Sequence, residues 1–69
     1  MDTSFKKIVK IRMLLLDIST EKLCRALNIS EATHYRYLRH PELMTVGMFS
    51  SYADYLNFSD EEIKEAISC

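Results

Sequence analysis

The residues best suited to chemistry lie between positions 30 and 40, where Arg36 and Arg39 follow a short polar segment. A guanidinium group can donate two parallel hydrogen bonds to guanine O6 and N7, and it also neutralises a phosphate. If the stretch is helical, the arginines share a mixed polar surface with Glu31, Ala32, Thr33 and Tyr35. Such a surface is suited to binding nucleic acid.

Histidine and cysteine could also carry chemistry, but their spacing does not favour it. Cys24, His34, His40 and Cys69 could in principle form a zinc set, yet no CxxC or HxxxH spacing is present. We expect Cys24 to be a small core residue, His34 a satisfied, partly buried side chain, and His40 a cation at a helix end. No nucleophile, base and oxyanion grouping is visible, so we expect neither an enzyme nor a cofactor or metal.

Two short helices joined by a tight turn would position the arginines. Ser19 is a typical helix cap, and Leu23 and Leu27 repeat at a spacing of four. Asn28 tolerates the left-handed conformation in which a helix ends, and Ile29 follows as a hydrophobic plug. The first of these helices is therefore expected to end at the turn around Asn28.

The second helix is expected to span residues 31–39, after a cap at Ser30. Tyr37 and Leu38 would point inward. Pro41 ends the helix, because proline cannot donate a backbone hydrogen bond and disfavours helix in the residue before it.

Three further helices are predicted along the chain. The first, capped by Thr3 or Ser4, ends near Asp17. Its inner face would carry Phe5, Ile8, Val9, Met13 and Leu16, and its outer face Lys6, Lys7 and Lys10.

A connector is expected over residues 39–44. The fourth helix then follows the cap Thr45 and ends at Asn57. Ser59 and Glu62 form a capping box at the start of the last helix. The inner residues expected of these two helices are Val46, Phe49, Ala53, Leu56, Ile63 and Ile67. No strand pattern is present.

Composition agrees with one all-α domain over residues 1–69, a compact bundle of about five short helices around a central helix-turn-helix. The longest apolar run has four residues, too short to span a bilayer, and no secretory signal is visible, so we expect a cytoplasmic protein. Eight basic and four acidic residues precede Pro41, whereas one basic and six acidic residues lie from Pro41 onward. The basic half carries the helix-turn-helix, as a phosphate-facing surface would.

The segment from Leu23 to Tyr37 resembles the helix-turn-helix of the lambda-repressor/Cro-like family of DNA-binding proteins. The matching positions are Leu23, Cys24, Leu27, Asn28, Ile29, Ser30 and Tyr37. The family domain is a five-helix bundle of similar length, and LNFSDEEI resembles its last turn and final helix. Two positions depart from the family pattern: His34 replaces a buried Val or Ile, and Thr20 replaces a common Gln.

The resemblance implies a small phage-type transcriptional regulator that binds an operator in double-stranded DNA, with the helix 31–39 in the major groove. The DNA-binding positions that it implies are Thr20, Ser30, Glu31, Ala32, Thr33, Tyr35, Arg36 and Arg39. It also implies a homodimer on paired half-sites. The residues available for self-association are Met44, Met48, Tyr52, Tyr55, Phe58 and the last helix, and we expect either Tyr52 or Tyr55 to be exposed.

An alternative of a different class stays open. The chain could keep this fold and act as a protein-binding, antirepressor-like modulator that docks on a repressor or another regulator instead of DNA. The acidic second half and the net charge of −1 favour this alternative.

Overall fold

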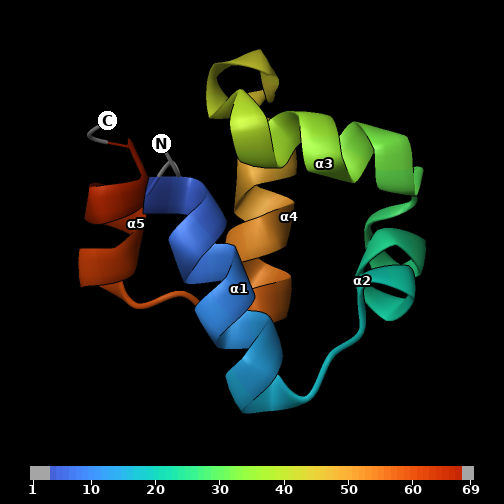
Figure 1. The fold of residues 1–69 in the computed structure, drawn as a ribbon. Helices are drawn as coiled ribbons and strands as arrows, with labels where there is room; N and C mark the ends of the chain where they lie inside the picture. Colours follow the sequence, from blue (N-terminus) through green and yellow to red (C-terminus); the bar gives the residue numbers. More distant parts are fainter. Residues whose placement is uncertain (1–3, 68–69) are drawn as a thin grey trace.

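The structure, a computed structural model, describes residues 4–67, which form five α-helices joined by short turns (Figure 1). The helices are α1 (Ser4–Leu16), α2 (Thr20–Leu27), α3 (Glu31–Arg39), α4 (Val46–Leu56) and α5 (Asp60–Ile67). A single 3-10 turn, η1 (Pro41–Leu43), lies within the predicted connector. No strand occurs in this part of the chain, so the predicted all-α bundle is confirmed. The predicted cap Thr3 lies outside the described residues.

Four helices begin at the side chains predicted to cap them. Ser19, Ser30 and Thr45 each accept a hydrogen bond from the backbone N–H three residues later, at 3.0–3.1 Å. At α5 the capping box is complete, because the Glu62 N–H donates to Ser59 Oγ (3.2 Å) and the Ser59 N–H donates to Glu62 Oε1 (2.9 Å). These local hydrogen bonds satisfy backbone donors that the helix itself leaves unpaired.

Three connections turn through a residue in the left-handed region. Asp17, Asn28 and Asn57 have φ values of 55°, 58° and 58°, and each directly follows the last residue of a helix. Short polar side chains tolerate this conformation better than other non-glycine residues do. The predicted helix ends near Asp17, Asn28 and Asn57 are therefore confirmed.

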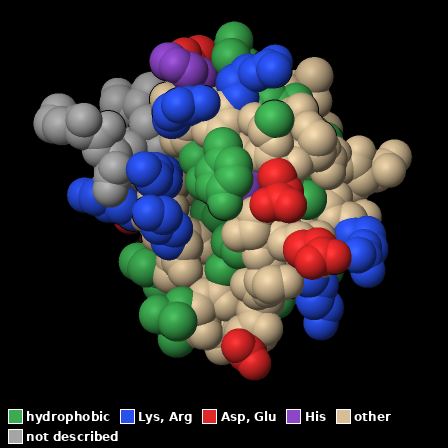
Figure 2. All heavy atoms as spheres, turned by 45° about the vertical axis from the view of Figure 1, so that its right-hand side comes forward, with side chains coloured by type: hydrophobic (Ala, Val, Ile, Leu, Met, Phe, Trp, Pro, Cys, Tyr) green, Lys and Arg blue, Asp and Glu red, His purple; other side chains and the backbone are tan. Residues whose placement is uncertain are grey.

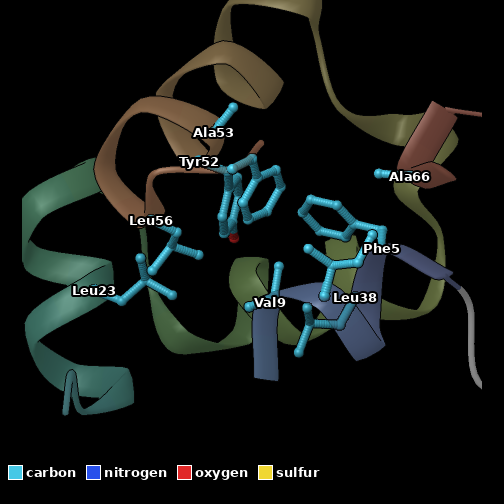
Figure 3. Packing of buried hydrophobic residues seen from close by; sticks show 10 residues of the cluster. Phe5, Val9, Leu23, Leu38, Tyr52, Ala53, Leu56 and Ala66 are labelled. Atoms are coloured by element: carbon cyan, nitrogen blue, oxygen red, sulfur yellow. The ribbon is translucent and has the colours of Figure 1, made fainter. Parts of the chain in front are cut away.

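The core gathers side chains from all five helices, and Figure 3 shows its central part. Phe5 from α1 packs edge-on against Tyr52 from α4, with 5.1 Å between the ring centroids. Leu23 from α2 and Leu56 from α4 are fully buried. Because α1 contacts α3, α4 and α5, it forms the scaffold against which α3 is held.

Three residues predicted to face inward are exposed instead: Leu16, Val46 and Ile67. Each is the first or last residue of its helix, and two of them, Val46 and Ile67, border the same open hollow. Val46, for example, begins α4 and keeps 84% of its surface exposed. The apolar spacing continues there, but no neighbouring element covers the side chain.

Candidate nucleic-acid interface

Helix α3 has one buried face and one outward face. His34 and Leu38 are buried, and Tyr37 is half-buried against the core. The inward direction predicted for Leu38 and Tyr37 is thus confirmed. The outward face carries the exposed residues Glu31, Ala32, Tyr35, Arg36 and Arg39.

The buried face is anchored by a polar contact between α3 and α4. His34 is only 1% exposed, and its Nδ1 lies 2.8 Å from the hydroxyl of Tyr52, with the two rings stacked. Burial lowers the pKa of His34, an effect that the charge of Glu31 partly opposes. Burial raises the pKa of Tyr52. Both side chains are therefore neutral at neutral pH and hydrogen-bonded to each other.

This contact corrects two predictions. His34 is satisfied, as expected, but it is fully buried instead of partly buried. Neither candidate tyrosine is exposed, because Tyr52 is completely buried at the His34 contact and Tyr55 is half-buried against the core. Phe58 is buried and both Met44 and Met48 pack against the core, so these residues serve the fold.

The remaining histidine and cysteine predictions concern residues away from this contact. Cys24 is a buried free thiol, as predicted, and burial raises its pKa. His40 follows α3 as its C-cap and lies 3.4 Å from Glu42. Cys69 lies outside the described residues. Nowhere in residues 4–67 do three His, Cys, Asp or Glu side chains gather as metal ligands would.

The predicted site residues near the helix starts divide into two groups. Ser30 and Thr33 serve the local structure, because Ser30 Oγ accepts from the Thr33 N–H and also bonds to the Thr33 hydroxyl at 2.9 Å. Thr20, the first residue of α2, is half-buried and lines a hollow between α1 and α3. Glu31 and Ala32 are exposed beside Ser30.

The two arginines of α3 are exposed, and neither has an ion-pair partner within the described part of the chain. On α2, by contrast, Arg25 pairs with Glu21 at 2.6 Å. A guanidinium group without an internal partner keeps its donors available for an external anion. Arg36 and Arg39 are therefore the described arginines best placed to bind one.

Two lysines of α1 extend this cationic surface. Lys6, Lys10, Tyr35, Leu38 and Arg39 line a hollow of about 430 Å³ between α1 and α3. In Figure 2, Lys and Arg side chains gather along one side of a central hydrophobic side-chain patch, while on the other side Lys and Arg lie beside Asp and Glu. Sequence reasoning placed Lys6 and Lys10 on the polar side of their helix but not beside Arg39. Their spacing of four was the available signal, because it places both on one helix face.

Comparison of the chain with protein-family models, curated proteins and solved structures finds no match. None of the helices in residues 4–67 combines the length and apolar character needed to cross a membrane. The arrangement of residues therefore supplies the argument for function: a helix fixed by its inner face presents unpaired cations, an aromatic hydroxyl and a small apolar residue outward.

Proposed function

We propose that this chain binds double-stranded DNA through α3 and acts as a small, phage-type transcriptional regulator that occupies an operator. The observation that carries the proposal is the outward face of α3, on which Arg36 and Arg39 are exposed and unpaired within residues 4–67. His34 and Leu38 fasten the opposite face to the core. An α-helix held in this way fits the major groove, which is about 12 Å wide.

The exposed residues of α3 match the chemistry of base edges. Arg36 can form two parallel hydrogen bonds with guanine O6 and N7, and Ala32 can pack on a thymine methyl group. Glu31 is exposed next to the cap and can accept a hydrogen bond from cytosine N4. The remaining acid of the helix-turn-helix, Glu21, is paired with Arg25 and so opposes phosphate less strongly.

Duplex binding and its salt dependence test this proposal. The probe is a duplex selected by the protein from a random-sequence pool, and binding is measured across a range of salt concentrations. Affinity should fall steeply as salt rises, because each neutralised phosphate releases counterions. A protein that selects no duplex, or whose duplex binding is insensitive to salt, contradicts the proposal.

Replacement of Arg36 separates base recognition from general charge. Arg36→Ala should weaken binding to the selected duplex by about 5- to 150-fold, since a bidentate arginine–guanine contact contributes about 1–3 kcal/mol. Lys7→Ala removes one positive charge from an exposed residue of α1 that lines neither hollow beside α3, and it should have a smaller effect. Unchanged affinity of Arg36→Ala would show that Arg36 has been assigned wrongly.

The proposal includes a homodimer, because one such module recognises few base pairs and two-fold proteins bind paired half-sites. A footprint containing two inverted half-sites, with two chains per duplex in sedimentation, is the expected result. One chain on one half-site would contradict the dimer and leave DNA binding in place.

A second candidate function is supported by a different surface. Ile11, Leu14 and Leu15 lie on one exposed face of α1, and Leu14 and Leu15 keep 83% and 69% of their surface exposed. Contiguous exposed apolar patches occur at protein–protein interaction sites. This face supports the antirepressor-like alternative, in which the chain docks on another regulator.

A further inference from the structure

We infer that the seam between α1 and α3 is a second binding site, which holds phosphates of the DNA backbone beside the bases contacted by α3. The inference rests on the proposed function and specifies how the duplex lies on the protein. The α1/α3 seam is defined here by five side chains: Lys6, Lys10, Lys22, Tyr35 and Arg39.

The first part of the seam is the hollow of about 430 Å³ in which lysines of α1 face Tyr35 and Arg39 of α3. Lys6 and Lys10 lie one turn apart on the same face of α1, about 6 Å along the helix axis. Two cations at successive turns, opposite an arginine from another helix, form a row of positive charge. Leu38 forms the apolar floor, and Lys10 and Arg39 are exposed at the rim, where an anion can reach them.

A second hollow, of about 630 Å³, continues the seam toward α2. It shares Lys10, Tyr35 and Leu38 with the first hollow and adds Thr20 and Lys22 at the start of α2. The two hollows thus adjoin each other at Tyr35, and together we call them the channel, which runs from Arg39 to Lys22. The acid that lines this channel, Asp17, lies at its far end, just after the last residue of α1.

Tyr35 lines both hollows and is about half exposed. Its ring lies 5.3 Å from the ring of His34, which is itself anchored by Tyr52. Its phenol, with lysines of the channel on either side, can donate a hydrogen bond to a phosphate oxygen.

The opposite flank of α3 differs in charge. There Glu21, Arg25, Ser30 and Glu31 line a shallow hollow on the α2 side, so two carboxylates accompany a single guanidinium. In Figure 2, basic side chains on one side of the hydrophobic patch stand apart from acids, whereas those on the other side lie beside them. One DNA strand would therefore be held by the α1/α3 seam, and the orientation of α3 in the groove follows from this asymmetry.

A pair of lysine variants on α1 tests the site. Lys10→Ala removes a cation from the channel, whereas Lys7→Ala removes one from a neighbouring exposed position that lines neither hollow. Binding is measured for the selected duplex and for a scrambled duplex of equal length, at several salt concentrations. Tyr35→Phe and Lys10→Gln are measured alongside, and circular dichroism confirms that each variant is folded.

Lys10→Ala and Lys10→Gln should weaken binding to both duplexes by a similar factor, about three- to tenfold. The slope of log affinity against log salt should fall by about one, because one phosphate contact is lost. Tyr35→Phe should weaken binding with little change in that slope, and Lys7→Ala should have the smallest effect.

Two results would overturn the inference. Equal effects of Lys7→Ala and Lys10→Ala would show that only overall charge matters, and loss of discrimination between the duplexes in Lys10→Ala would indicate a base contact. In either case a strong effect of Arg36→Ala would leave the proposed function standing. If the parent protein binds neither duplex, the proposed function fails, and the inference fails with it.

Discussion

His34 and Tyr52 form a buried polar pair that joins the outward-facing helix to the core. Their 2.8 Å contact links α3 to α4 across 18 positions of the chain. A buried donor or acceptor that loses its partner costs more than the hydrogen bond itself contributes, because it has also lost its contact with water. The pair therefore holds α3 in position as long as both members are present.

Removal of one member should destabilise the protein. Tyr52→Phe keeps the ring and deletes the hydroxyl, so we expect the free energy of unfolding to fall by about 1–3 kcal/mol. Tyr55→Phe is the matched control, because Tyr55 is half-buried and has no side-chain hydrogen bond in residues 4–67, and it should change stability little. Urea unfolding followed by circular dichroism measures both. Equal stabilities of the two variants would contradict a structural role for the His34–Tyr52 contact.

The same pair predicts a pH dependence of stability. Burial lowers the pKa of His34 from its usual 6.5, while Glu31, the charged residue that acts on it, partly opposes the shift. The unfolded chain therefore binds more protons than the folded one below about pH 6.5, and stability should fall as the pH decreases through that range. Above about pH 6.5, His34 is neutral in both the folded and the unfolded chain, and its contribution to stability no longer changes with pH.

Urea unfolding of the parent and of His34→Leu at pH 7.5 and pH 5.0 checks this expectation. The parent should lose stability between the two values, and the variant should lose less. The lower of the two pH values, pH 5.0, stays above the range in which folded Glu62 titrates, because hydrogen bonds from Arg12 and the Ser59 backbone N–H lower the pKa of its carboxyl. An identical loss in both proteins would exclude His34 as its source.

At the scale of the elements, the turn between α2 and α3 depends on one left-handed residue. Asn28 has φ of 58° and ψ of 45°, and its N–H bonds to the Arg25 carbonyl. Asn28→Ala should lower the free energy of unfolding by about 1 kcal/mol, because alanine pays the full penalty for this conformation. Asn28→Gly should be at least as stable as the parent at this position. Thermal unfolding compares them, and an alanine variant as stable as the glycine variant would contradict the argument.

The helices and their ends were predictable because their signals are local. Ser19, Ser30 and Thr45 lie within three residues of the donors they cap, and Asn28 and Asn57 act at their own positions. The exposed side of α3 was predictable for the same reason, since helical periodicity places His34 and Leu38 on one face of the helix and its polar residues on the other.

The parts that could not be predicted depend on tertiary contacts. Lys10 lies beside Tyr35 only because α1 packs against α3, and nothing in either segment specifies that packing. The pairing of Arg12 with Glu62 joins residues 50 positions apart, at 2.9 Å from Nε to Oε1. Periodicity also gives no sign of where neighbouring elements end, so Val46 was wrongly placed inside.

At the scale of the whole molecule, two surfaces of α1 support different partners. Lysines on one side border the α1/α3 seam, while Ile11 and Leu15 are exposed apolar residues that line neither hollow of the seam; Leu14 lies between them and borders the larger hollow. The chain as a whole has a net charge of −1, so attraction to DNA depends on where its charges lie. The ion pair between Arg12 and Glu62 neutralises the cation of α1 that faces the acidic helix α5.

Because Ile11 and Leu15 line neither hollow of the seam, variants of these residues and of Arg36 should affect different surfaces. Ile11→Gln with Leu15→Gln replaces exposed apolar side chains by neutral, helix-favouring ones, so stability should change by no more than about 0.5 kcal/mol per site. The double variant should bind the selected duplex as the parent does, whereas Arg36→Ala should not. Fluorescence anisotropy with labelled duplex measures both, and urea unfolding confirms that each protein is folded. Loss of duplex binding in this double variant, with Arg36→Ala unaffected, would contradict the assignment of DNA recognition to α3 and would place the DNA-contacting surface on the outer face of α1.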